Sequence, residues 1–184
     1  ESNYLKEIFN LIFPEFANLK RLDRLKKISG YSKINLNLLL AILLIDKDNN
    51  HEYFCHKYNV SNDIKDELNL LANNLKLLQD NKDFFIKDME KHVYFYNKNH
   101  LINLNILNFT SNTKNSFKNF SETMKNILKS KIQKFNIDGK YLIERGMREG
   151  VLLGKVLRKI EEEWIENNFK ISDDRVKEII RQNS

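Results

Sequence analysis

Apolar residues recur at the three- and four-residue spacing of α-helices along almost the whole chain, and the alternating runs that indicate strands are scarce. This pattern predicts an all-α protein: a multi-helix antiparallel bundle, the body, followed by a small helical tail lobe. The expected helices cover roughly residues 4–12, 16–28, 36–45, 51–57, 61–78, 83–95, 101–107, 116–135, 140–145, 150–166 and a last one that begins after Ser172.

Local signals mark where several of these helices begin and end. Pro14 ends the first helix and Gly30 follows the second, while the stretch 36–45 is apolar nearly all round, as in a central buried helix. Ser61 and Ser172 are expected N-caps, each followed by aspartates in the early turns. Polar turns are expected at residues 46–50 and 97–100.

The expected boundary between the two lobes is a polar segment. Residues 110–115 are rich in Ser, Thr and Asn and show no core position, which predicts a loop or linker. We therefore expect a helical body domain over residues 1–110, and a basic connecting helix with a helical tail domain over residues 111–184.

Four of the five glycines lie within sixteen residues of the tail, at Gly139, Gly146, Gly150 and Gly154. Glycine concentrated in a helical protein serves the backbone, through a positive φ at a helix end or a close approach of another group. We expect Gly139 to precede a short helix, Gly146 to cap its C-terminus and Gly150 to open a long helix. Gly154, inside that helix, is expected to mark tight packing against a neighbour.

The charge of the chain is concentrated in one block. The formal net charge is +6 with a pI near 9.2. Residues 1–110 hold 15 Lys/Arg against 14 Asp/Glu, residues 111–159 hold 12 against 4, and residues 160–184 hold 4 against 7. Such a basic block is typical of phosphate binding, because each contacted phosphate releases condensed counterions.

The other candidate sites are weak. Asp46 and Asp48 have the D-x-D spacing of a metal site, but they follow an apolar helix in an Asn-rich turn. His51 and His56 diverge by about 140° on a helix, unlike a two-histidine zinc motif. Cys55 lacks a resolving cysteine, and no phosphate-binding loop, dinucleotide fingerprint or nucleophile elbow is present. The sequence therefore predicts no catalytic residue and no metal site.

Composition also bears on the compartment. A single Cys excludes an internal disulfide framework, and the longest apolar stretch, residues 36–45, is too short to cross a bilayer. We expect a cytoplasmic protein with no membrane partner.

The remaining candidate surface surrounds the glycine cluster. Its first helical amides at Gly150 suit a phosphate, and cations flank them. The expected phosphate contacts are Lys140, Arg145, Arg148, Lys155, Arg158 and Lys159, with Lys125, Lys129 and Lys131 as outer steering charges.

The run from Gly139 to Ile165 resembles the C-terminal tail of the class II tRNA nucleotidyltransferase (CCA-adding enzyme) and bacterial poly(A) polymerase family. Gly139, Lys140 and Leu142 match the first part of that tail, and the later glycines fall in register with Leu157, Glu161 and Trp164-Ile165. The segments LIFPEFANLKRLDRL and KYNVSNDIKDELNLLANNL are similar to the family's body helices, so the resemblance covers most of the chain.

Two positions depart from the family pattern. Tyr141 stands where the family usually has Asp, which removes a helix-initiating carboxylate that Asp138 can replace as a cap. Glu149 stands where the family usually has Pro, which loosens the turn and adds a negative charge.

The resemblance implies the body and tail of such an enzyme, isolated from its N-terminal catalytic head. The family's Gly-Ser turn with its metal-binding D-x-D, and the Glu-Asp-x-x-Arg motif that selects the nucleotide, have no counterpart in this sequence. The implied function is a non-catalytic module that holds tRNA or other RNA for CCA addition or polyadenylation. The fragment needs no cofactor, whereas the missing head uses Mg²⁺ with ATP or CTP.

Two alternatives remain open at this point. One is a helical protein-interaction module without an RNA role, in which Gly146, Gly150 and Gly154 give close helix packing. The other is a metal-dependent hydrolase that uses His51, His56 and nearby acids.

Overall fold

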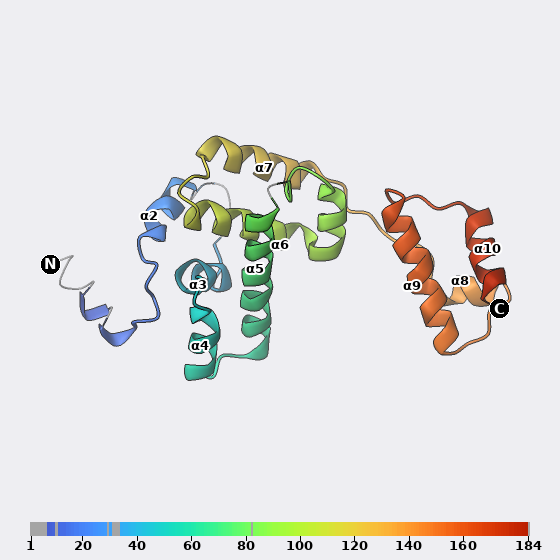
Figure 1. Cartoon of the computed structure of the whole chain (residues 1–184), viewed down its shortest axis with the longest axis horizontal. Coiled ribbons are helices and arrows are strands. Elements are labelled where there is room, and N and C mark those ends of the chain that lie inside the picture. Colours follow the sequence, from blue (N-terminus) through green and yellow to red (C-terminus); the bar gives the residue numbers. More distant parts are fainter. Residues whose placement is uncertain (1–6, 10, 29, 31–33, 82, 184) are drawn as a thin grey trace. The chain divides into compact units, whose positions relative to one another are not determined.

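The structure is a computed structural model that describes residues 7–9, 11–28, 30, 34–81 and 83–183. Within these ranges every regular element is a helix, which confirms the all-α class (Figure 1). The chain forms two compact units, Glu1–Ser130 and Lys131–Ser184, each with its own hydrophobic core. Among the described helices, none combines the length and the apolar character needed to cross a membrane.

The first unit is built around one apolar helix. Its elements are α2 (Arg21–Leu25), a 3-10 turn (Lys26–Ile28), α3 (Leu36–Leu44), α4 (Asn50–Lys57), α5 (Asn62–Asp80), α6 (Met89–Ser111) and α7 (Phe117–Lys129). Helix α3 packs against α4, α5 and α6, and Leu38, Ala41, Ile42 and Leu44 are fully buried. The prediction of a central buried helix is confirmed.

The start of the first unit is less helical than expected. The predicted helix over residues 4–12 lies partly outside the described residues; within them, residues 7–9 and 11–12 are helical. The predicted helix over 16–28 was too long, since α2 begins only at Arg21. Arg21 Nη1 donates to the Ile42 and Ile45 carbonyls at 2.9 and 2.7 Å, so this segment is shaped by its anchoring to the last turn of α3.

Helix α6 joins two segments that were predicted separately. The backbone leaves helical geometry at Asn97 (φ 60°, ψ 162°), and its Oδ1 accepts the His100 N–H at 3.0 Å, so Asn97 caps the second segment. Instead of the turn expected at 97–100, the structure has a helix that is interrupted at a single residue, Asn97. The first segment begins at Met89 rather than at 83, because residues 83–86 form a turn.

The expected linker at 110–115 is not the division between the units. Thr110 is buried inside α6, where its hydroxyl donates to the Ile106 and Leu107 carbonyls. Helix α7 then packs on α6, and the chain divides between Ser130 and Lys131 instead of between 110 and 111. The physical reason is the apolar face of α7, whose Phe120, Met124 and Ile127 enter the core of the first unit.

One guanidinium holds the α6–α7 connection in place. Arg24 of α2 donates through Nε to the Phe109 carbonyl and through Nη2 to the Asn115 carbonyl, both at 2.7 Å. A third bond reaches the Asn112 carbonyl at 3.3 Å, and the guanidinium lies 4.2 Å from the centre of the Phe109 ring. Because Arg24 stays charged, these bonds are stronger than neutral ones. The buried Asn105 amide adds a bond to the Phe120 carbonyl.

The second unit contains α8 (Gly139–Ile143), α9 (Val151–Glu166) and α10 (Asp173–Gln182) (Figure 1). Its core comprises Leu142, Met147, Val156, Ile160, Val176, Ile179 and Ile180. A forked ion pair between Arg175 and Glu163, at 2.6 and 2.9 Å, joins α10 to α9. Residues 131–138 precede α8 without regular structure, so the basic helix expected over 116–135 ends early, at Lys129.

The packing of α7 generates a stability prediction. Phe120→Ala should lower the free energy of unfolding of the first unit by about 3–5 kcal/mol, because a fully buried ring leaves a cavity. Leu128→Ala, an exposed position on the same helix, is the control and should change it by less than about 1 kcal/mol. Far-ultraviolet circular dichroism during urea unfolding follows both units, and most of its signal comes from the first, which holds most of the helical residues.

The fluorescence of the single tryptophan, Trp164, reports the second unit separately. The urea concentration at the midpoint of this fluorescence change should be the same in Phe120→Ala as in the unchanged chain. A shift of the tryptophan transition instead of the dichroism transition would show that α7 belongs with the tail.

Candidate nucleic-acid interface

The turn after α8 depends on Gly146. This residue has φ +95°, its N–H donates to the Ile143 carbonyl at 2.9 Å, and the Met147 N–H donates to the Leu142 carbonyl at 3.1 Å. This is the Schellman arrangement, in which a left-handed residue satisfies the last helical carbonyls. Leu142 and Met147 meet in the core below it. The prediction that Gly146 caps α8 is confirmed.

The expected helix starts are also present. Asp138 accepts the Tyr141 N–H at 2.8 Å and so caps α8, which compensates for the tyrosine at position 141. Ser172 caps α10 in the same way through the Arg175 N–H, whereas Ser61 precedes α5 without a side-chain bond. Gly150 is the N-cap of α9 with φ +139°, a conformation that favours glycine.

The expectation for Gly154 is wrong. A Cβ built at this position meets no atom within 4 Å, so the glycine does not allow a close approach of a neighbouring helix. The tight contact is at Gly139, where a Cβ would lie 3.1 Å from Leu153 Cδ2. The interpretation of Gly146, Gly150 and Gly154 as a close-packing motif is therefore wrong for Gly154.

Helix α9 carries the exposed cations of the expected interface. Lys155 and Lys159 lie one turn apart on one face with Arg158 beside them, and all three are exposed. Lys155 and Arg158 make no ion pair or side-chain hydrogen bond with any part of the chain that the structure describes. Lys159 lies near Glu163, whose pKa is lowered chiefly by the hydrogen bonds from Arg175. Lys140 and Arg148 are exposed in the preceding turns of the same unit.

Arg145 differs from the other expected contacts. Its guanidinium lies 3.4 Å from the centre of the Tyr141 ring and 3.9 Å from Asp173 Oδ2. The Tyr141 hydroxyl donates to Asp173, which raises the pKa of the phenol and lowers that of the carboxyl. Arg145 is thus held inside the unit and partly neutralised, and it joins α8 to α10. Its role as a phosphate contact stays a prediction.

The outer steering charges are divided between the two units. Lys125 and Lys129 belong to α7 in the first unit, whereas Lys131 begins the second. The basic block of residues 111–159 is therefore divided between two units. Within the second unit, residues 131–159 hold eight Lys/Arg against three Asp/Glu.

The candidates for metal chemistry have structural roles. Asp46 Oδ1 accepts the N–H groups of Asp48 and Asn50 at 3.0 and 3.2 Å, so it stabilises the turn into α4. His51 is buried, and this burial lowers its pKa, whereas His56 is exposed on the same helix. The two rings therefore do not converge. Across the described residues, no three His, Cys, Asp or Glu side chains gather as metal ligands would.

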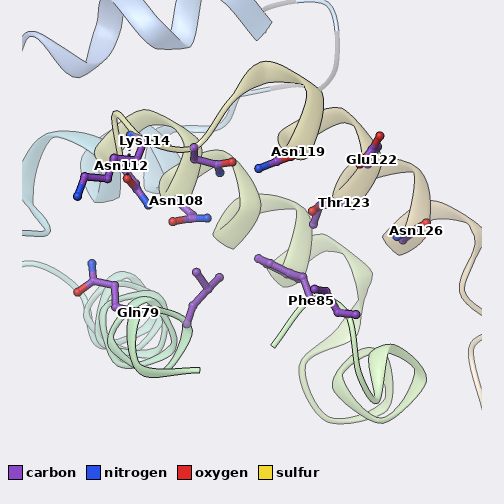
Figure 2. Close-up of a pocket in the computed structure, with 12 residues that line it drawn as sticks. Gln79, Phe85, Asn108, Asn112, Lys114, Asn119, Glu122, Thr123 and Asn126 are labelled. Carbon is purple, nitrogen blue, oxygen red and sulfur yellow. Dashed lines mark hydrogen bonds between the residues drawn. The ribbon is translucent and has the colours of Figure 1, made fainter. Parts of the chain in front are cut away.

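The structure shows one feature that the sequence interpretation missed. A groove of about 550 Å³ lies between the end of α5, the turn at 83–86, α6 and α7 (Figure 2). Its lining is Leu78, Gln79, Phe85, Ile86, Asn108, Asn112, Lys114, Asn115, Asn119, Glu122, Thr123 and Asn126. The available signal was the spacing of Asn119, Thr123 and Asn126, which places uncharged polar groups on one face of α7 beside its apolar face.

Comparison with known proteins identifies the family. The sequence pattern described as tRNA nucleotidyltransferase domain 2 matches residues 32–180, which is more than half of the chain. The chain belongs to this tRNA nucleotidyltransferase domain 2 family. No curated protein and no solved structure matches it. The match runs from just before α3 into α10 and so includes parts of both units.

The family supports the resemblance found in the sequence. The domain is related to tRNA nucleotidyltransferases, which are enzymes of tRNA processing. Its two all-α units agree with the helical body and tail expected from the sequence. The specific RNA contacts are not given by the family match and belong to the proposal below.

The glycines of the domain generate opposite predictions. Gly146→Ala should destabilise the second unit by about 1–2 kcal/mol, because an L side chain is strained at φ +95°. Gly154→Ala should stabilise it by about 0.5–1 kcal/mol, because alanine favours the helix and nothing obstructs its methyl group. Trp164 fluorescence during urea unfolding measures both changes. Destabilisation by Gly154→Ala would restore the close-packing interpretation.

Proposed function

We propose that this chain is the part of a tRNA nucleotidyltransferase that holds tRNA through shape and phosphate contacts, and that it carries no catalytic centre itself. The observation that supports the proposal most directly is the pair Lys155 and Arg158 on α9, exposed and unpaired within the described structure. Unpaired surface cations are available for phosphates, since no internal ion pair has to be broken first.

The form of the basic surface suits an RNA stem. An A-form helix is recognised through its backbone and shape, which requires phosphate contacts and no reading of bases. The first amides of α9, after Gly150, add donors at the positive end of the helix dipole, beside Lys155. Glu161, Glu162, Glu163 and Glu166 follow on the helix, so all its cations precede its acidic residues.

The proposed partner of the domain is a catalytic head in the same polypeptide. That head would use Mg²⁺ with ATP or CTP, and the tRNA held here would present its 3′ end to it. Neither CCA addition nor polyadenylation is favoured by the residues of the domain, since the nucleotide is selected elsewhere. A helical protein-interaction module has weaker support now that Gly154 contacts no neighbour.

Salt dependence tests the phosphate contacts. The chain should bind tRNA with a slope of log K against log salt near −4 to −5, as expected for about six contacts. The double variant Lys155→Gln/Arg158→Gln should bind more weakly and reduce the magnitude of this slope by about 1.5–2. Fluorescence anisotropy of labelled tRNA over a salt series measures both quantities.

A matched variant separates position from net charge. Lys177→Gln/Arg181→Gln removes the same charge from exposed positions of α10 in the same unit. It should leave the salt slope near that of the unchanged chain. An equal loss in both double variants would mean that net charge alone attracts RNA, and the α9 surface would be rejected.

Catalysis is tested on the same protein. The chain incubated with ATP, CTP, Mg²⁺ and tRNA lacking its 3′ nucleotides should leave the RNA length unchanged, because Asp46 is used in a turn and no three His, Cys, Asp or Glu side chains of the described residues gather as metal ligands would. Gel electrophoresis with a complete tRNA nucleotidyltransferase as the positive control measures extension. Extension by this chain alone would contradict its non-catalytic role.

A further inference from the structure

The groove between α5, α6 and α7 contains a polar group that the fold does not satisfy. Asn108 is only 7% exposed, and its Oδ1 is buried without a hydrogen-bond partner. A buried acceptor without a partner is unfavourable by about 1–3 kcal/mol, and such groups are rare in folded proteins. Figure 2 shows the Asn108 side chain in the groove, between Gln79 and Phe85.

Further unpaired amides surround Asn108. Gln79, Asn119 and Asn126 line the groove, and no hydrogen bond of their side chains is found in the described structure. Thr123 and Glu122 stand among them on α7, and Phe85 and Ile86 supply apolar surface on the side of the 83–86 turn. Amide side chains present a donor and an acceptor side by side, the arrangement that pairs with the edge of a nucleobase. The groove has the size of a small-ligand pocket.

The rim of the groove is rigid and basic. Arg24 fixes the backbone of residues 109–115, so the amides at this end are held in place before any ligand binds. Lys118, Lys125 and Lys129 are spaced seven and four residues apart and share one exposed face of α7, next to the face of Asn119 and Thr123. They extend over about 16 Å of helix, which exceeds the spacing of neighbouring phosphates in a strand. Glu122 lies between them and can accept a ribose 2′-hydroxyl.

We propose that this groove binds an unpaired nucleotide of an RNA strand, with its base beside Asn108 and Phe85 and its phosphates along the lysines of α7. A strand is favoured over a free nucleotide because the lysines extend beyond one phosphate. RNA is favoured over an extended peptide because the neighbouring face is cationic and Phe85 offers an apolar surface for a base.

The groove is expected to favour a purine. Asn108 Oδ1 is enclosed, so an entering base meets the exposed amides of Gln79, Asn119 and Asn126 and the ring of Phe85. Amides offer donors and acceptors to any base, whereas stacking on an aromatic ring is stronger for a purine than for uracil. A labelled oligoadenylate should therefore bind several-fold more tightly than an oligouridylate of equal length.

Two groove variants test the assignment by fluorescence anisotropy. Asn108→Leu keeps the branching and the number of heavy atoms of the side chain and removes its amide, so it should preserve or raise stability while weakening oligoadenylate binding about tenfold. Asn119→Ala changes an exposed position of the groove, so its effect on binding can be measured even if Asn108→Leu fails to fold. Asn73→Ala, at an exposed asparagine of α5 outside the groove, is the control and should bind normally.

Binding at the groove can be distinguished from the tRNA binding proposed for α9 in the second unit. Lys155→Gln/Arg158→Gln should retain oligoadenylate binding, since these residues belong to the other unit. Loss of binding in the tail variant with retention in both groove variants would overturn this proposal and leave the tRNA-holding function standing. Equal binding of oligouridylate, of an RNA duplex or of a polyglutamate peptide with the same charge would also overturn it, because each would show an unselective basic surface.

Discussion

The bonds from Arg24 to the carbonyls of Phe109, Asn112 and Asn115 fix the course of the chain where α6 ends and α7 begins. Backbone carbonyls at the end of a helix have no partner within that helix and must find one elsewhere. Here a permanently charged group from α2 supplies it, far away in sequence. Helix α7 is thereby returned along α6, where Phe120, Met124 and Ile127 complete the core of the first unit.

The position of α7 gives one helix three different surfaces. Its apolar face is buried, its Asn and Thr side chains form one wall of the groove, and its lysines face solvent beside that wall. A cationic face beside unpaired amides combines attraction for a phosphate backbone with the ability to read a base. The expected contacts of the second unit are cations, which suit a stem whose bases are already paired.

Caps and turns could be read from the sequence because they depend on a few neighbouring residues. Asp138 and Ser172 hold helix starts, and Gly146 holds a helix end, each through bonds that span five residues or fewer. The all-α class followed from the helical spacing of apolar residues in the same way. The glycine register also carried the family resemblance, which the match over residues 32–180 supports.

What the sequence by itself determined is thus the kind and order of the helices, the caps of the tail and the presence of a basic block. Only the tertiary structure decided that α7 belongs to the first unit, that Gly154 has no close neighbour and that Arg145 is held by Tyr141 and Asp173. The reason is that spacing along a helix shows which residues share a face, but not which distant segment that face meets. The unsatisfied Asn108 and its groove depend on three helices at once, so they could be found only in the folded chain.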